Sequence, residues 1–427
     1  MLKHHTVVKG ALWLLLLLAL VPIGLRYDHR FRSLFTYKPN LLFYDTRIFL
    51  SELAKYEKSG VLYDTQQEKY FRPGSPVYKY PPPYAALLTL IKSQRWKPMA
   101  QKIAALDLAA LAATVFLIAR RRRWSPLGLA ALLVLVLAWS PVDESLNGPQ
   151  LEPLLLLLLT AAAFLSGSRR AELGAGAAIG AAAALKVYPG LFALLLVARR
   201  RWTALVGMMA GGLITLLLAS LVIPPRFAVE YFTRILPHLG GTGLGPENVS
   251  LAGTIGRLAL LVFAGAAHAA KLWQSIQLNI LEECGVPSAI WTTRALHLLV
   301  GAVMVLATAR AWRVSLISGP LREALLFGAA LCLVVFLSPT SWLDYQTLLL
   351  LPLLLAIREL PAWSRDRGSW FLLAVAIFLG VLSPEWSIWG TEALTLSLLR
   401  AMLSVVVWVL TLRALAAPRD IDAAIVA

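Results

Sequence analysis

The sequence predicts an all-helical protein that crosses a membrane many times. Of its 427 residues, 59% are hydrophobic and 15% are charged, whereas a soluble domain has about 45–50% apolar and about 25% charged residues. The apolar residues form long runs such as 203–223, 321–338 and 391–412, and about 20 such residues span a bilayer core. Short arginine clusters stand at the ends of these runs, which is typical of cytoplasmic turns between spans.

The net charge and the cysteines narrow the class of protein. The charge of +17 does not indicate nucleic-acid binding, because no basic helix or aromatic-interleaved patch is present. Cys332 lies inside an apolar run, so we expect no disulfide with Cys284. No zinc spacing, Walker loop or Rossmann fingerprint is present. We therefore expect no cofactor; a divalent metal is allowed but not indicated.

The first half of the chain alternates spans with arginine-bearing turns. Lys3 and Lys9 place the N-terminus in the cytoplasm, and no cleavage site follows the first span at about 10–25, so we read it as uncleaved. Residues 26–97 form a first outer region with juxtamembrane helices, including a short interfacial helix at 84–91. Further spans are expected at about 99–119, 127–140 and 150–165, with an outer turn at Asn147 to Gln150.

Residues 172–198 are apolar, yet arginines stand immediately before and after them. Both ends should therefore be cytoplasmic. At about 1.5 Å per residue, neither half of the segment is long enough to cross comfortably, and Pro189 with Gly190 favours a break. We predict a re-entrant hairpin that turns inside the membrane at Lys186, where irregular backbone must be buried in protein or face a water-filled cavity.

The sequence of the second half of the chain predicts further spans and a second outer region at 224–290. The spans are expected at about 203–223, 291–309, 321–338, 346–358, 369–382 and 392–412, with an outer turn at 384–390. The whole chain, 1–427, then forms one integral membrane domain with about 10 full spans plus the hairpin, or about 12 membrane helices, and both termini are cytoplasmic. No internal repeat is visible, which weakens a secondary-transporter interpretation.

Two polar features stand in the first outer region. A helix predicted from Asp45 is amphipathic, with Phe49 and Leu53 on one face, and should rest on the membrane. Asp45 at its start is either a helix N-cap or a general base that takes a proton from a sugar hydroxyl. Tyr80 stands before three prolines. This segment is either a rigid lead into a short helix or, through its aromatic side chains, a platform for a sugar.

Two cations could contact a phosphate. Lys186, close to Tyr188, lies within an apolar segment, where a charge is costly unless it is paired; its partner is either a lipid phosphate or an internal group. Arg257 follows Asn248 and Ser250, and it either holds a phosphate in bidentate fashion or is an ordinary interfacial arginine. Ser250 could cap the helix that carries Arg257.

The turn at 338–345 contains Trp342 and Asp344. An aromatic residue and a carboxylate at the end of a span could be an interfacial anchor and a cap. They could also touch a sugar.

Taken in order, these pieces resemble glycosyltransferase family 87, which includes polyprenol-phosphate-mannose-dependent α-mannosyltransferases. The matching pieces are Asp45 with Phe49, Gly60 and Tyr63; Tyr80 with Pro81 and Pro82; Asn147 to Gln150, near the family's N-G-Q; Leu185 to Pro189; Asn248 to Ser250 with Gly253 and Arg257; and Ser338 to Trp342. Two features depart from the family: Pro149 interrupts N-G-Q, and no histidine follows Trp342. Both bear on the substrate more than on the fold.

The resemblance implies the GT-C membrane fold and an inverting sugar transfer on the non-cytoplasmic face of a bacterial plasma membrane. The donor would be a polyprenyl-phosphate sugar, with mannose as the family default, and the acceptor a lipid-linked or other glycan. Asp45 would be the catalytic base, and Lys186 and Arg257 would hold the donor phosphate. The remaining candidate substrate contacts are Tyr80, Asn147, Gln150, Tyr188, Asn248, Ser250, Trp342 and Asp344.

Two alternatives remain. A flippase or transporter of lipid-linked sugars would share the basic residues but would not need a base at Asp45. The sugar could also be arabinofuranose or another pentose or hexose.

Overall fold

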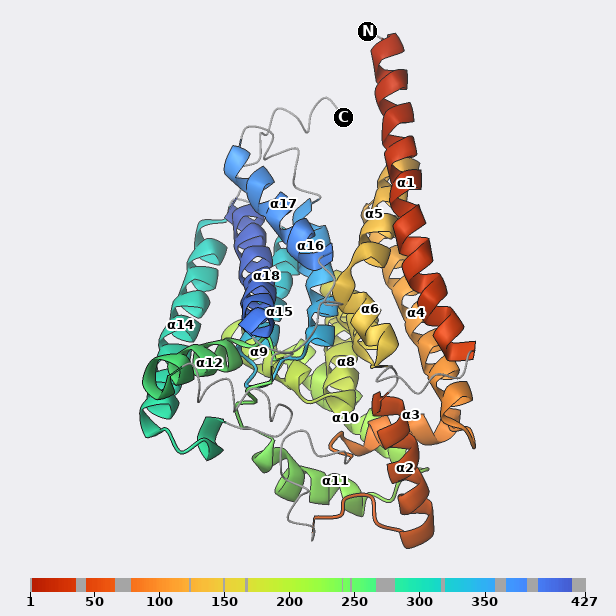
Figure 1. The fold of residues 1–427 in the computed structure, drawn as a ribbon, viewed down its shortest axis with the longest axis vertical. Helices are drawn as coiled ribbons and strands as arrows, with labels where there is room; N and C mark the ends of the chain where they lie inside the picture. The colour runs from red at the N-terminus through yellow and green to blue at the C-terminus, as the bar shows by residue number, and fades with distance from the viewer. Residues whose placement is uncertain are drawn as a thin grey trace.

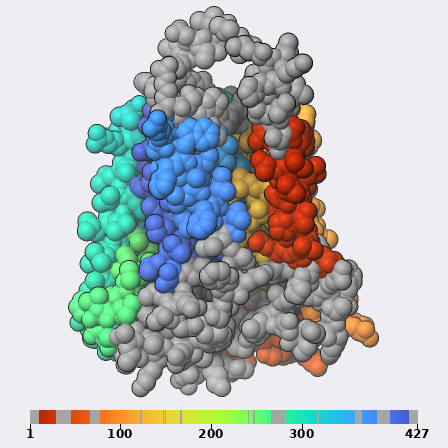
Figure 2. All heavy atoms as spheres, turned by 45° about the horizontal axis from the view of Figure 1, so that its top comes forward, coloured from red at the N-terminus to blue at the C-terminus, as the bar shows by residue number. Residues whose placement is uncertain are grey.

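A computed structural model describes most of the chain. The described residues are 2–35, 44–65, 78–122, 124–148, 150–165, 168–239, 241–245, 248–265, 281–315, 319–357, 366–381 and 391–416. Within these ranges every regular element is a helix, apart from isolated β-bridge residues, among which Asn248 pairs with Trp342. Figures 1 and 2 show α1 along one flank of the body and α14 along the other, with the C-terminal helices between them. The all-helical class expected from the sequence is therefore present.

The helices follow one another closely. In the first half they are α1 (Leu2–Phe35), α2 (Tyr44–Ser59), α3 (Pro82–Ile91), α4 (Trp96–Arg122), α5 (Pro126–Ala138), α6 (Ser140–Asn147), α7 (Glu152–Phe164), α8 (Arg169–Leu185), η2 (Tyr188–Leu191), α9 (Phe192–Ala198) and α10 (Trp202–Ser220). In the second half they are α11 (Arg226–Glu230), η3 (Tyr231–Ile235), η4 (Leu236–His238), α12 (Leu251–Ala264), η5 (Leu281–Glu283), α14 (Pro287–Val314), α15 (Pro320–Leu337), η6 (Leu343–Leu349), α16 (Leu350–Ile357), α17 (Arg367–Val381) and α18 (Thr391–Ala416).

Five of the described helices are long and apolar enough to cross a membrane: α4, α10, α14, α15 and α18. A sixth span results if α5 and α6, which are bent by 59° at their junction, count as one. The expected 10 full spans and 12 membrane helices are thus not confirmed. Prolines stand in the first turn of several helices, the position where a proline is tolerated. Pro141 is the second residue of α6, and Pro153 is the second residue of α7.

The predicted break in the segment 172–198 is present. α8 ends at Leu185, Lys186 has extended backbone, and the chain continues through the short helices η2 and α9. Arg201, just after α9, lies 3.7 Å from the Glu172 carboxylate in the first turn of α8. The two ends of the segment therefore meet, and Lys186 lies at the turn.

Arginines tie the open end of the hairpin to the neighbouring helices. Arg199 and Arg201 pair with Glu323 at the start of α15, at 3.2 and 2.8 Å. Arg199 and Arg322 each stack on the Trp312 ring at 3.7 Å. The residues expected at cytoplasmic turns thus gather at one end of α8, and Lys186 stands at the other.

Glycines bring α8 and α10 into backbone contact. A Cβ added at Gly176 would lie 1.9 Å from the Ala204 carbonyl oxygen, and one at Gly180 would lie 2.0 Å from the Met208 carbonyl oxygen. Small residues four apart allow membrane helices this close approach. The pair holds the end of α8, and with it Lys186, in place.

Replacing Gly180 by alanine is expected to lower the free energy of unfolding by about 1–3 kcal/mol, because the new methyl group meets the backbone of α10. Gly212→Ala is the matched control, since its Cβ would lie 3.5 Å from its nearest neighbour, the Gly180 carbonyl oxygen. Thermal unfolding in detergent compares the two variants. Equal melting temperatures would contradict the close helix contact.

The region expected to lie outside the membrane is built on aromatic packing around α2. Phe49 and Leu53 are buried, as the amphipathic pattern predicts. The Phe49 ring contacts Tyr80 at 5.4 Å and Tyr84 at 5.3 Å. In Figure 1, α2, α3 and α11 lie together at the end of the molecule away from the two termini. The expected outer turn at 384–390 lies outside the described residues.

Candidate functional site

A buried lysine lies at the centre of the candidate site. Lys186 is 3% exposed and forms an ion pair with Glu152, which is fully buried at the start of α7. Its ammonium also donates a hydrogen bond to Gln150 Oε1 at 3.2 Å, and it lies 3.7 Å from Asp344 Oδ2. A charge removed from water is tolerated when it is paired and hydrogen-bonded. Glu152 supplies the ion pair and Gln150 the hydrogen bond, both from within the protein.

Three tyrosines surround this cation. The Lys186 ammonium lies 4.6 Å from the centre of the Tyr345 ring and 5.4 Å from that of Tyr80. Tyr188 stacks on Tyr345 with ring centres 4.7 Å apart, and the Tyr80 hydroxyl donates to Gln150 Oε1 at 3.2 Å. Ring faces attract a cation within about 6 Å, so the aromatic groups add to the stabilisation of the charge.

We call this group the Lys186 site. It consists of Tyr80, Gln150, Glu152, Lys186, Tyr188, Asp344 and Tyr345. The structure thus brings together five residues that the sequence analysis proposed separately: Tyr80, Gln150, Lys186, Tyr188 and Asp344. They come from the segment before α3, the α6–α7 turn, the hairpin turn and η6. Carboxylates, an ammonium and aromatic faces in one place can bind both a charged group and sugar hydroxyls.

Two acidic residues of this region were missed. Glu152 is the tight partner of Lys186. Asp107 is fully buried on α4, which packs against α7, and neither of its carboxylate oxygens has a hydrogen-bond partner. Both interrupt apolar runs, and a charged residue in such a run indicates function or pairing. The rule that drew attention to Lys186 applies equally to these two residues.

A second polar cluster joins the loop before α12 to the turn before η6. Asn248 Oδ1 accepts from the backbone N–H groups of Ser250 at 3.2 Å and Ser341 at 2.9 Å, and the β-bridge pairs Asn248 with Trp342. Ser250 Oγ accepts from Gly253 N at 3.0 Å, which confirms the helix cap. Asp344 follows Trp342 by two residues in the same turn. The contacts between Asn248 and this turn therefore help to position Asp344 in the Lys186 site.

Arg257 is buried beside that joint. Nη1 donates to the Gly245 carbonyl at 2.8 Å, and Nη2 donates to the Asn248 carbonyl at 2.9 Å and to Ser397 Oγ. Nε has no hydrogen-bond partner. In this structure the guanidinium therefore holds the loop backbone, and Nε–H and the second N–H of Nη1 are the donors that remain for another group.

Asp45 and Asn147 are placed only by their backbone, because their side chains lie outside the described residues. Asp45 lies in the first turn of α2, which begins one residue earlier, at Tyr44. Phe49 follows one turn later on the same face, and its ring contacts Tyr80. Asp45 therefore stands on the α2 face that leads to the Lys186 site. Among the described residues, no group of three or more histidine, cysteine or acidic side chains could hold a metal.

The comparisons with known proteins give a family and a weak structural likeness. No curated protein matches the chain. Two crystal structures of ArnT from Cupriavidus metallidurans are similar at 15% identity: the one bound to undecaprenyl phosphate covers 96% of this chain and 78% of its own with a TM-score of 0.34, and the apo form covers 87% and 72% with a TM-score of 0.31. These TM-scores are low, and the assignment rests on sequence.

That sequence match is extensive. The sequence model of glycosyltransferase family 87 matches residues 78–339, which is more than half of the chain and runs from the segment before α3 to the end of α15. The match includes Tyr80, Gln150, Glu152, Lys186 and Tyr188 of the Lys186 site. The chain belongs to glycosyltransferase family 87.

Proposed function

We propose that the protein is an inverting membrane glycosyltransferase that moves a sugar from a polyprenyl-phosphate donor to a lipid-linked or glycan acceptor. The observation that carries this proposal is the Lys186 site, in which a buried cation, carboxylates and tyrosines converge in a member of a glycosyltransferase family. We propose mannose as the sugar and a GT-C fold. The active site would face the outside of a bacterial plasma membrane, with both termini in the cytoplasm.

Lys186 would stabilise the phosphate as it leaves the sugar. A preorganised cation in a site with little water is worth more than the same cation in solution. Glu152 and Gln150 hold the ammonium, while its 3.7 Å contact with Asp344 is long for an ion pair. The donor phosphate would bind the Lys186 ammonium on the side where Asp344 is now its distant partner. Lys186 would keep its ion pair with Glu152 and its hydrogen bond to Gln150.

Arg257 would be the second phosphate contact. Nη2 has two acceptors and Nη1 has one, so the phosphate would accept its hydrogen bond from Nε–H or from the second N–H of Nη1. Asn147, Asn248, Ser250 and Trp342 would shape the substrate site around the two cations, together with the residues of the Lys186 site.

Asp45 would be the catalytic base. A carboxylate within hydrogen-bond reach of the acceptor hydroxyl removes its proton as the oxygen attacks the anomeric carbon. The attack comes from the face opposite the phosphate, so the configuration inverts and no covalent sugar–enzyme intermediate forms. The sugar–phosphate bond is already activated, so the reaction needs no nucleotide.

The test is sugar transfer by the full chain in nanodiscs, with polyprenyl-phosphate-mannose and a panel of lipid acceptors. We expect a mannosylated product whose anomeric configuration, read by NMR, is opposite to that of the donor. Retained configuration would overturn the inverting mechanism. Movement of the carrier lipid across a liposome bilayer without transfer to any acceptor would instead support the flippase.

A further inference from the structure

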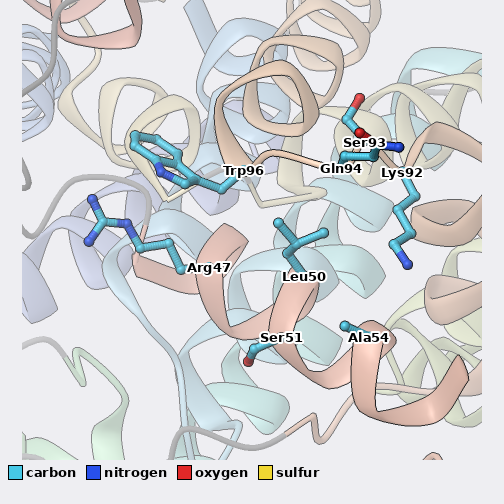
Figure 3. Close-up of a pocket in the computed structure, with 8 residues that line it drawn as sticks. All are labelled: Arg47, Leu50, Ser51, Ala54, Lys92, Ser93, Gln94 and Trp96. Carbon is cyan, nitrogen blue, oxygen red and sulfur yellow. The ribbon is translucent and has the colours of Figure 1, made fainter. Parts of the chain in front are cut away.

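An open groove lies on the outer helices, away from the Lys186 site. Its volume is about 660 Å³. One wall is a single face of α2, formed by Arg47, Leu50, Ser51 and Ala54. The other is the turn after α3, with Lys92, Ser93 and Gln94, together with Trp96 at the start of α4. Figure 3 shows Arg47 and Trp96 at one end of the groove and Lys92 at the other. The floor is largely apolar and the ends are cationic.

The charge of this groove favours an anion. Residues 92–102 contain four basic residues and no acidic one. Among the groove cations, Lys92 is the one with an ionic partner, Glu57, whose side chain is 53% exposed. A cluster of lysine and arginine at a membrane surface attracts anionic lipid headgroups. The excess of positive charge therefore complements a lipid that carries a phosphate.

Arg47 is held ready to bind. Its guanidinium stacks on the Trp96 ring at 4.7 Å, and its Nε is buried without a hydrogen-bond partner. Stacking on an aromatic ring orients the planar guanidinium while leaving its edge free for a phosphate.

The groove lies close to the proposed base along the helix axis but on another face of α2. Arg47 follows Asp45 by two residues, a rise of about 3 Å, and residues two apart point to opposite sides of a helix. A ligand whose phosphate meets Arg47 would therefore reach Asp45 by passing around the start of α2.

We propose that this groove binds the phosphate-bearing headgroup of the acceptor lipid. The apolar floor takes the upper part of the lipid, Arg47 and Lys92 bind the phosphate, and the headgroup sugar or polyol extends around the start of α2 toward Asp45. The assignment of this lipid as the acceptor substrate rests on the proposed glycosyltransferase function. The binding of an anionic lipid to the groove does not depend on it.

The test measures lipid binding without donor, so it is independent of sugar transfer. The full chain in detergent is titrated with phosphatidic acid and with phosphatidylcholine of the same chain length, and bound lipid is counted by native mass spectrometry. We expect preference for phosphatidic acid, and a loss of about tenfold in its affinity in Arg47→Gln, because a charged hydrogen bond is removed. Ala54→Trp, which fills the groove and leaves every charge, should weaken binding as well.

Arg294→Gln is the matched control. Arg294 also lies over a tryptophan, Trp291, at 5.7 Å, and its side chain is 54% exposed, but it does not line this groove. Its affinity for phosphatidic acid should equal that of the wild type. Equal binding of both lipids, an unchanged affinity in Arg47→Gln and Ala54→Trp, or an equal loss in Arg294→Gln would overturn the proposal. Displacement of the lipid by an equal concentration of inorganic phosphate would overturn the lipid as its ligand.

The acceptor role has its own readout. In the transfer assay, Arg47→Gln should raise the KM for the acceptor and leave the KM for the donor unchanged. If lipid binding follows the expected pattern while the wild type transfers no sugar, the groove stands and the proposed enzyme fails. If transfer occurs and the acceptor KM does not move, the groove fails as the acceptor site.

Discussion

Replacing Asp45 by asparagine is expected to reduce sugar transfer by about 10²–10⁴-fold, the usual contribution of a general base. Asparagine is nearly as good as aspartate at the start of a helix, so α2 should still form and the melting temperature should stay close to that of the wild type. Because the lost group acts on the acceptor hydroxyl, donor binding should remain. Rates under saturating donor, together with thermal unfolding, measure both effects.

The Asp45→Asn result separates a catalytic carboxylate from a structural one. Asp64→Asn removes another carboxylate of the same outer region and should transfer sugar at the wild-type rate. If Asp45→Asn also transfers at that rate, Asp45 contributes only to the helix start. Asp344, which lies 3.7 Å from Lys186, would then be the next base to test.

Replacing Lys186 by methionine is expected to abolish donor use and to lower the free energy of unfolding by about 3–5 kcal/mol. Glu152 is fully buried, and loss of its partner would leave a buried charge without compensation, which is the costly way to break an ion pair. Asp344 is less affected, because its side chain is 12% exposed and can reach water. Transfer assays and thermal unfolding in the same detergent provide the two measurements.

A second substitution distinguishes stability from function. In Lys186→Met/Glu152→Leu both charges are gone, so the melting temperature should recover toward that of the wild type, since an apolar pair replaces a buried ion pair at little cost. Transfer should stay absent, because the phosphate still lacks its cation. Wild-type stability of the single variant would contradict the buried pair, and restored transfer in the double variant would remove Lys186 from phosphate binding.

The local features of the fold could be predicted from the order of residues. The amphipathic pattern after Asp45 indicated α2, because Phe49 and Leu53, four residues apart, lie on one face of a helix and the polar residues lie on the other. Arginines on both sides of residues 172–198 indicated a hairpin, and Arg201 indeed lies against Glu172. The number of spans was harder to predict, since prolines and bends divide apolar runs into helices too short to count as spans.

The candidate site could be predicted only in part. Lys186 was recognisable as a charge inside an apolar run, and so were Asp107 and Glu152 by the same rule. Which of these charges meet could not be predicted, because Glu152 lies 34 positions from Lys186 and Asp344 far beyond the second outer region. Arg257 was open to two interpretations for the same reason, since one of its partners, Ser397, is 140 positions away.

The sequence by itself determined that the chain is a membrane protein and that its polar residues gather in a few motifs, because run length, charge at run ends and helical periodicity are properties of neighbours along the chain. Only the tertiary structure decided that Lys186 is neutralised by Glu152, that Arg257 turns toward backbone carbonyls, and that α2 and the α3–α4 turn enclose a cationic groove. These depend on how helices pack, and the close approach of α8 to α10 is what places the hairpin turn among the tyrosines.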